Sequence, residues 1–326
     1  SPFLFPSFKS LDLAYKIMIL AVLVASFDIL LGNTGILSFG HVMFFCIGAY
    51  SVALLLGNFA EPTYGYLFLG FVIAILVTMA LALLISFLSL RVQAIFFAMV
   101  TLAIAEFAII LATKLSSFTG GEDGLIMSTP GIFKVSFNMG TFMGVDITGR
   151  IITYYFTLAI CLILFLLMVR FIQSPLGRVM QAIRDNEPRA EAIGYRTFVF
   201  KATSICFGCL VSTILGGLYV MWVGYANPES VLGVTIMLVV LLMVILGGMG
   251  TLSGALAGAA FLRLAETFLP DLQNLAQDLM PNMHIVHSIM ERWLLIFGIL
   301  FILVVFFFPK GIIGTIQNYL KQRKTV

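Results

Sequence analysis

The sequence has few charged residues, few cysteines and no long run of basic residues. Charged residues make up 10% of its 326 residues and hydrophobic residues 61%, whereas a soluble domain would carry about 25% charge. This deficit excludes an ordinary water-soluble domain, and four cysteines provide no disulfide framework. A net charge of +3 without a basic cluster argues against nucleic acid as a partner.

The chain also lacks motifs that would support chemistry of its own. It has no G-x-x-x-x-G-K-[ST] sequence to hold nucleotide phosphates. His284 and His287 have no acidic or cysteine partner at metal-binding spacing. Cys206 and Cys209 form a C-x-x-C pair, but the apolar residues around them favour packing over redox or metal chemistry. We therefore expect neither a metal nor a cofactor on this chain.

Long apolar runs dominate what is present. A helix needs about 20 apolar residues to cross a bilayer, and several runs reach or approach that length. They are 11–31, 38–57, 66–90, 92–114, 151–172, 198–223, 232–247, 251–269 and 291–309. We expect an all-α polytopic membrane protein with one transmembrane domain over 1–326 and about 8–10 transmembrane helices, some broken at glycine.

The basic residues predict an orientation, because Lys and Arg concentrate on the cytoplasmic side of membrane proteins. The segment 173–197 and the C-terminal tail are rich in both, so we expect both in the cytoplasm. Alternate crossings then place the long loop 115–150 outside. A nine-span count also puts the N-terminus outside despite Lys9 and Lys16, unless a further break lies within the first 60 residues.

A short pattern occurs twice in the chain. Residues 32–38, GNTGILS, match residues 247–253, GGMGTLS, as G-x-x-G-x-L-S, and each lies between two apolar runs. Glycine-broken helices at matching positions are typical of duplicated transport proteins. The match predicts an internal duplication, although a chain with 29 glycines could also produce it by chance.

The segment 174–196, SPLGRVMQAIRDNEPRAEAIGYR, concentrates charge. Its seven charged residues are Arg178, Arg184, Asp185, Glu187, Arg189, Glu191 and Arg196. Ser174 and Pro175 form a helix start, since a hydroxyl caps the helix and proline fits its first position. A second short helix begins at Glu187-Pro188, and Gly194 can end it in a left-handed conformation.

The first of these helices is predicted to be amphipathic. Leu176, Val179, Met180 and Ile183 recur at helical spacing on one face, away from Arg178, Gln181, Arg184 and Asp185. The two helices are too short to span a bilayer. They could lie on its surface, or they could fit a groove on a soluble partner, which is the interpretation we favour.

Ionisable residues within apolar runs are costly in lipid and suggest function. Asp28, Glu106, Arg263 and Glu266 are the candidates. Arg263 and Glu266 are spaced to pair on one helix face. Glu106 has no local partner and is the preferred polar group near a transport pathway. Asp28 fits either role.

Six blocks of this sequence, in order along nearly the whole chain, resemble the membrane subunits of ABC importers for branched-chain amino acids. The blocks are residues 32–50, 91–107, 119–125, 174–194, 241–259 and 292–314. Two positions depart from the family pattern: Ile36 stands where glutamine is common and Asp28 where asparagine is common. Both lie near the first block, so they bear on substrate rather than on family.

The resemblance implies a permease subunit that carries out no catalysis. Its partners would be two ATPase subunits, which bind ATP and Mg²⁺, a second homologous permease, a soluble substrate-binding protein and the lipid bilayer. It would be a multi-pass protein of the bacterial inner membrane with a cytoplasmic C-terminus, moving its substrate by alternating access. ATP-driven closure of the partner would act on residues 175–194.

The resemblance also assigns candidate site residues. The ATPase-coupling residues would be Leu176, Gly177, Arg178, Ala182, Arg184, Asp185, Glu187, Arg189, Glu191 and Gly194. The glycine breaks and polar residues of the apolar runs, with which the resemblance is consistent, suggest a substrate pathway that includes Ser38, His41, Thr101, Glu106, Gly247, Gly248, Gly250 and Ser253.

Three classes of function compete. A permease subunit carrying a small amino acid, most plausibly branched-chain or hydrophobic, ranks first; the same architecture could carry urea or short amides. A self-contained secondary transporter or channel would have no use for the charged segment 174–196. A membrane-embedded enzyme would need more than Ser38 and His41, which no other residue completes into a site.

Overall fold

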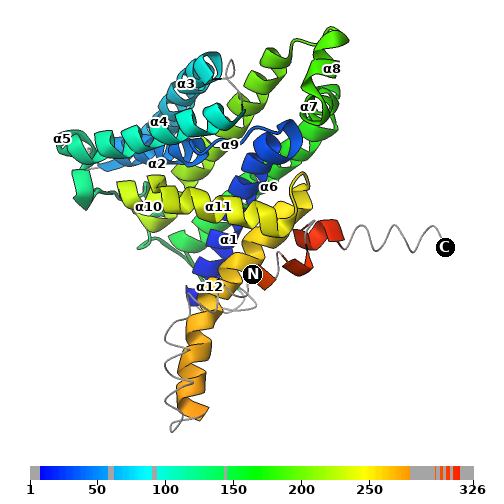
Figure 1. Cartoon of the computed structure of the whole chain (residues 1–326). Coiled ribbons are helices and arrows are strands. Elements are labelled where there is room, and N and C mark those ends of the chain that lie inside the picture. Colours follow the sequence, from blue (N-terminus) through cyan, green and yellow to red (C-terminus); the bar gives the residue numbers. More distant parts are fainter. Residues whose placement is uncertain are drawn as a thin grey trace.

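The computed structural model describes residues 8–57, 62–89, 94–142, 145–279, 298, 302–303, 306–308 and 311–315. Nearly all of the regular structure in these residues is helical (Figure 1). The first half contains α1 (Phe8–Asp28), a π-helical turn η1 (Ile29–Asn33), α2 (His41–Gly57), α3 (Tyr64–Ser89), α4 (Ala94–Lys114) and α5 (Ser116–Thr119). The second contains α6 (Gly149–Gln173), α7 (Pro175–Asp185), α8 (Glu187–Ala192), α9 (Thr197–Val223), α10 (Pro228–Leu232), α11 (Val234–Gly247) and α12 (Leu252–Leu279).

Six of the described helical segments are long and apolar enough to cross a membrane. They are Lys9–Asn33, Tyr64–Leu88, Ile95–Lys114, Gly149–Gln173, Thr197–Val223 and Pro228–Gly247. The shorter apolar helix α2 covers the run expected at 38–57, and α12 the run at 251–269. The expected run at 291–309 lies mostly outside the described residues. The all-α polytopic fold is confirmed, while the number of crossings stays a prediction.

Helices α1 and α9 lie at the centre of the bundle. In their most apolar stretches 72% and 78% of the residues are buried, against 28% in α3 and 22% in α4. The outer faces of α3 and α4 expose large apolar side chains such as Phe68 and Ile95, which are 72% and 73% exposed. A surface of this kind is suited to lipid, as expected for a membrane protein.

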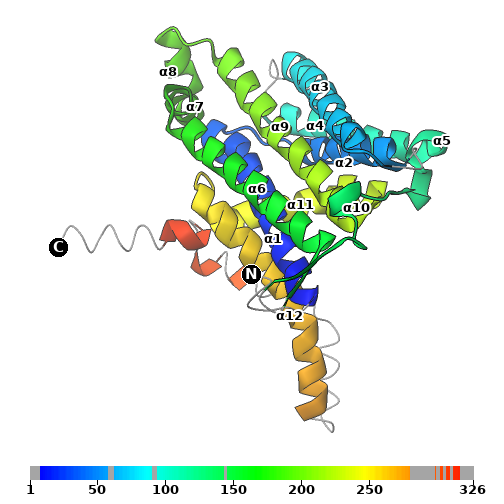
Figure 2. The ribbon, with the colours of Figure 1, turned by 180° about the vertical axis from the view of Figure 1, so that it is seen from behind.

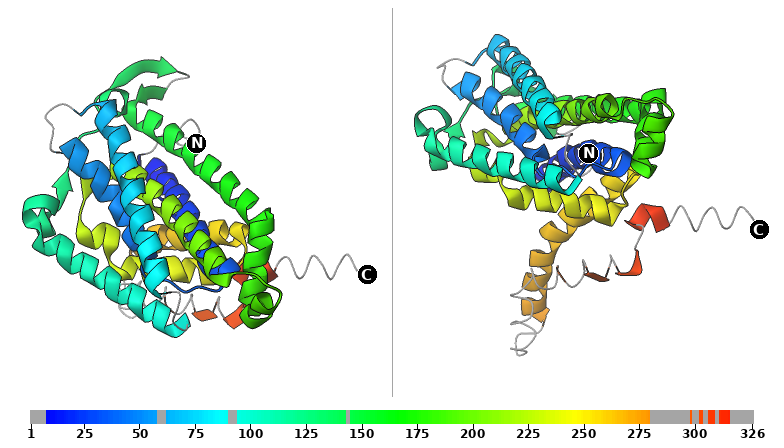
Figure 3. Two further views of the ribbon diagram at one scale, coloured as in Figure 1. Left: turned by 90° about the horizontal axis from the view of Figure 1, so that it is seen from above. Right: turned by 45° about the horizontal axis from the view of Figure 1, so that its top comes forward.

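The bundle has two distinct ends. Helices α7 and α8 project together at one end, which we call the α7 end (Figures 1 and 2). At the opposite end, β1 (Leu125–Ile126) pairs antiparallel with β4 (Tyr225–Ala226). Figure 3 shows that α7 and α8 remain at the margin of the bundle when it is viewed from above.

Helix α1 runs antiparallel to α9. The Tyr15 hydroxyl donates to the Leu218 carbonyl at 2.6 Å, and the Tyr15 ring stacks on Trp222. At the other end of the pair, the hydroxyls of Thr34 and Ser204 lie 2.8 Å apart. Since α9 begins next to α8, α1 begins at the end opposite α7, as the nine-span count requires.

The loop expected at 115–150 contains regular structure. Besides α5 and β1 it holds the 3-10 turns η2 (Gly121–Asp123) and η3 (Gly131–Phe133), and the strands β2 (Asn138–Phe142) and β3 (Val145–Thr148). β2 and β3 pair antiparallel. Sequence analysis did not predict these strands, because the glycine-rich segment carries no alternating apolar pattern.

Candidate functional site

Helix α7 begins as its sequence predicts. The Ser174 hydroxyl accepts a hydrogen bond from the Gly177 amide at 3.3 Å and donates to the Phe171 carbonyl at 2.6 Å. Pro175 occupies the first turn, where its missing N–H is no loss. These contacts turn the chain sharply from α6 into α7 without leaving the first amides of α7 unpaired.

Helix α8 is capped at both ends. The Asn186 side chain accepts from the Arg189 amide at 3.0 Å, a cap that sequence analysis did not name. Gly194 has φ +99°, and the Tyr195 amide donates to the Ala190 carbonyl at 3.1 Å. This left-handed glycine ends α8 as predicted. The segment 174–196 is therefore two short, individually capped helices.

The apolar face of α7 packs on the protein. Met180 and Ile183 are 1% and 2% exposed, and α7 contacts α6, α9 and η1. Gly177 lies so close to α6 that a Cβ there would be 2.1 Å from the Ile172 carbonyl oxygen. Leu176, which shares the predicted apolar face but lies in the first turn of α7, is 44% exposed.

Most of the candidate coupling residues are exposed. Those exposed are Leu176, Arg178, Ala182, Arg184, Asp185, Arg189, Glu191 and Gly194, whereas Glu187 is half-buried and Gly177 buried. Glu187 accepts from the Lys201 ammonium at 2.5 Å, and Glu191 accepts from the Thr197 hydroxyl at 2.8 Å. These two contacts hold α8 against the start of α9.

Two apolar residues at the tip of this segment were missed by sequence analysis. Ile193 is 71% and Tyr195 43% exposed, directly after α8. Both stand among charged residues, and each flanks Gly194. An isoleucine beside a helix-ending glycine in a charged segment was the available signal. Together they place apolar surface directly after α8, at the α7 end.

Two glycine turns lie against the inner side of α7. We call residues 32–38 the first turn and 247–253 the second turn. Gly35 and Gly250 occupy matching positions of the repeated pattern, and both have positive φ, +74° and +82°. L-residues with a side chain rarely adopt that conformation, so the pattern marks two similar helix breaks at the α7 end. The duplication itself stays a hypothesis.

Helix α7 contacts the first turn through two polar side chains. The Gln181 amide donates to Asn33 Oδ1 at 3.2 Å, and Arg184 Nη1 donates to the Gly32 carbonyl. The second turn is tied to the first by Asp28, whose Oδ1 accepts from the Gly250 amide at 2.8 Å. The segment 174–196 is thus linked through hydrogen bonds to both helix breaks.

The candidate pathway residues are divided between this region and others. Gly247 and Gly248 are buried, Gly250 is half-buried and Ser253 is exposed, all in the second turn. The Thr101 hydroxyl accepts from the Phe39 amide at 3.1 Å, which brings α4 close to Ser38 in the first turn. Glu106 is exposed on α4, further along that helix than Thr101.

His41 begins α2 deep in the bundle. It is fully buried, and its Nε2 lies 2.9 Å from the Ser26 hydroxyl on α1. The Ser212 hydroxyl of α9 donates to the His41 carbonyl at 3.2 Å. His41 thus connects α2 to both α1 and α9, while its place on a substrate pathway stays a prediction.

The chain matches the family model described as "Branched-chain amino acid transport system / permease component" over residues 10–305. This match covers most of the chain. The chain belongs to this permease family.

Individual relatives are similar along nearly the whole chain. High-affinity branched-chain amino acid transport system permease proteins LivM from Salmonella typhimurium and Escherichia coli are 28% and 27% identical. Each alignment covers 96% of this chain and 72% of the relative. The probable branched-chain amino acid transport permease protein LivM of Methanocaldococcus jannaschii is 26% identical over 65% of this chain and 58% of its own length. No solved structure shows a significant match.

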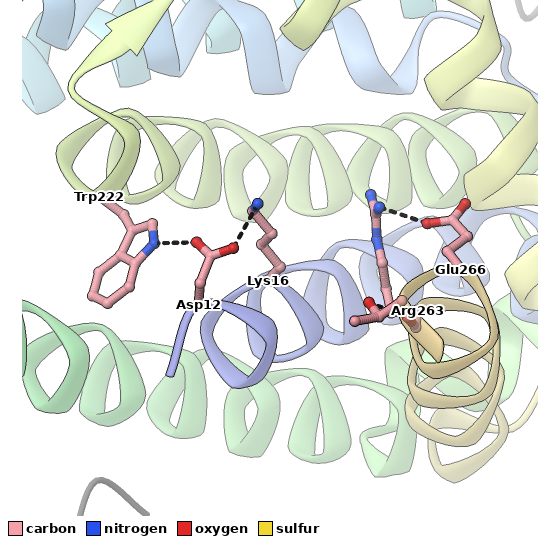
Figure 4. Close-up of polar contacts among 6 residues, drawn as sticks. Asp12, Lys16, Trp222, Arg263 and Glu266 are labelled. Atoms are coloured by element: carbon pink, nitrogen blue, oxygen red, sulfur yellow. Dashed lines mark hydrogen bonds and ion pairs between the residues drawn. The ribbon is translucent and has the colours of Figure 1, made fainter. Parts of the chain in front are cut away.

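In this permease, two pairs of charged side chains lie on α1 and α12 (Figure 4). Arg263 and Glu266 form the predicted pair on α12 at 2.7 Å. Asp12 of α1 accepts from the Trp222 ring at 2.8 Å and pairs with Lys16 at 2.7 Å. These contacts stabilise the bundle away from the α7 end and need no functional explanation.

Sites for metal or redox chemistry are not evident in the described part of the permease. No group of three or more His, Cys, Asp or Glu side chains comes together there. Cys206 and Cys209 are buried free thiols on α9, in the middle of a span as expected. His284 and His287 lie outside the described residues.

Proposed function

We propose that this chain is the permease subunit of an ATP-driven importer for branched-chain amino acids. It would act with two ATPase subunits, a second homologous permease and a soluble binding protein. Membership of the permease family supports the transport role, and similarity to branched-chain amino acid permeases supports the substrate class. ATP and Mg²⁺ would bind to the ATPase subunits.

The observation that carries the proposal is the orientation of α7 and α8. A helix that rests on a bilayer turns its apolar face toward lipid. Here the apolar residues Met180 and Ile183 face the protein. Arg178 and Asp185 are exposed, while Arg184, also exposed, reaches back to the Gly32 carbonyl. That arrangement suits a soluble partner better than lipid, and the partner of a permease on this face would be the ATPase.

Contact with the ATPase also sets the orientation of the chain. The α7 end would face the cytoplasm, and the end with β1 and β4 would face the binding protein outside. A Cβ on Gly311 would be 2.2 Å from Gly248 Cα, so the end of the described chain returns to the second turn. This contact supports a cytoplasmic C-terminus.

The transport step would be a rocking of the spans between outward and inward access. ATP binding would move the ATPase subunits, and the segment 174–196 would carry that movement into the membrane. Both glycine turns lie next to this segment, at breaks in the helices. They are therefore the expected places for the spans to change their relative angle.

The test is reconstitution of the permease with its ATPase and partner permease in proteoliposomes containing ATP, with the binding protein outside. We expect ATP-dependent uptake of leucine and no uptake of urea. Arg184→Ala and Glu187→Ala should weaken retention of the ATPase during purification. Uptake of urea in place of leucine would refute the substrate class. Leucine uptake by the permease alone, without ATPase, would instead indicate a secondary transporter.

A further inference from the structure

The two glycine turns and α7 meet at one small group of residues, Asp28, Gly32, Gly250 and Arg184. We call this group the glycine junction. A Cβ on Gly32 would be 2.2 Å from the Gly250 nitrogen and 2.1 Å from Asp28 Oδ1. A Cβ on Gly250 would be 3.2 Å from Arg184 Nη1. The backbones of the two turns are therefore in contact. If one turn moves far, either the other turn moves with it or this contact breaks.

Asp28 makes the only hydrogen bond found between α1 and the second turn in the described part of the chain. It is 1% exposed, and its Oδ1 accepts from the Gly250 amide across 222 positions of sequence. Its other oxygen, Oδ2, is buried without a hydrogen-bond partner among the described atoms. A buried carboxylate with an unpaired oxygen is costly, which is unexpected for a residue that serves packing alone.

Arg184 brings the coupling segment into the same junction. It is the second-last residue of α7, and its guanidinium donates to the Gly32 carbonyl. Gln181, one turn earlier on α7, holds Asn33 at 3.2 Å. Two side chains of α7 therefore bind the first turn. Asp28, at the end of α1 beside that turn, binds the second turn through the Gly250 amide.

These contacts point to a role for Asp28 that no relative's name assigns. We propose that Asp28 is a positioning residue that makes both glycine turns move together with α7 during transport. The inference rests on the proposed function, because it requires an ATPase that moves α7. Asp28 does not contact substrate in this account. Its hydrogen bond to Gly250 connects the first half of the permease to the second half. The connection lies next to α7, on which the ATPase would act.

The first experiment separates the hydrogen bond of Asp28 from its charge. Asp28→Ala removes the acceptor for the Gly250 amide, whereas Asp28→Asn keeps an oxygen that can accept it. We expect Asp28→Ala to lower leucine transported per ATP hydrolysed by about tenfold, since a lost hydrogen bond to a charged group has an effect of that order. Asp28→Asn should retain at least half of the normal ratio. The ATPase subunits should co-purify with both variants.

The matched control is Asp146→Ala, which removes an exposed carboxylate from β3. It should leave the ratio unchanged. A normal ratio in Asp28→Ala would overturn the proposal, as would an Asp28→Asn variant that is as defective as Asp28→Ala.

The second experiment does not depend on the stability of an alanine variant. Asn33→Cys and Gln181→Cys place two thiols where the native side chains form a hydrogen bond. Because Asn33 is 2% exposed, mild oxidation to a disulfide, rather than a maleimide reagent, should join α7 to the first turn; the permease without the two introduced cysteines is the control. If the turn moves with α7, the cross-linked complex should keep at least half of its uptake rate.

Two results of this experiment would overturn the proposal. Disulfide formation that stops uptake, with recovery of uptake after reduction, would mean that α7 slides past the first turn. Failure of oxidation to join the two free thiols would place them apart. Failure of the proposed function is distinguishable from both, because the unmodified complex would then show no ATP-driven leucine uptake.

Discussion

The exposed isoleucine at the tip of the α7 end provides the most direct quantitative prediction. Burying a whole isoleucine side chain is worth about 1.5–3 kcal/mol, and Ile193 is 71% exposed in the isolated chain. If the ATPase covers it, Ile193→Ala should weaken binding by roughly 1–2 kcal/mol. That corresponds to about a five- to thirtyfold increase in Kd for the ATPase.

The assay is titration of labelled ATPase onto the permease in lipid nanodiscs. Ile193→Asp should weaken binding further, because a carboxylate would be buried at the contact. Ile126→Ala is the matched control: Ile126 is 81% exposed, but it lies on β1 at the opposite end. An unchanged Kd for both Ile193 variants, or an equal effect of Ile126→Ala, would refute the reasoning.

Further predictions concern the local structure that supports the site. Ser174→Ala removes the N-cap of α7 and should destabilise its first turn by about 1 kcal/mol, seen as roughly fivefold faster amide exchange at Gly177; exchange at the normal rate would show that the cap is unimportant. Gly258→Ala should lower Tm in detergent, because its Cβ would lie 2.0 Å from the Met243 carbonyl oxygen and overpacking costs about 1–3 kcal/mol. Gly65→Ala, at a position with no atom within 4 Å, is the control and should leave Tm unchanged or slightly higher, whereas an equal loss in both variants would contradict the packing argument.

The features that the sequence predicted correctly are local. Ser174, Pro175 and Gly194 determine helix ends through contacts within a few residues, so their roles follow from residue type and spacing. The pair of Arg263 and Glu266 is local for the same reason. The apolar runs predicted the helices because bilayer thickness fixes the required length.

The features that were missed depend on contacts between distant parts of the chain. Asp28 fitted either role because its partner, the Gly250 amide, lies 222 residues away. The pairing of β1 with β4 joins Leu125 to Ala226, which are far apart in the sequence. Helical spacing placed Leu176 on one face with Met180 and Ile183, but spacing alone contains no information about which part of that face the rest of the protein covers.

The central claim is that the segment 174–196 is the surface on which a separate ATPase acts. The most direct measurement replaces Tyr195 with a photo-crosslinkable phenylalanine analogue in the assembled complex and identifies the adduct by mass spectrometry. The account predicts an adduct with the ATPase subunit, whose yield changes when ATP is added. An adduct with lipid alone, in a complex that transports leucine normally, would contradict it.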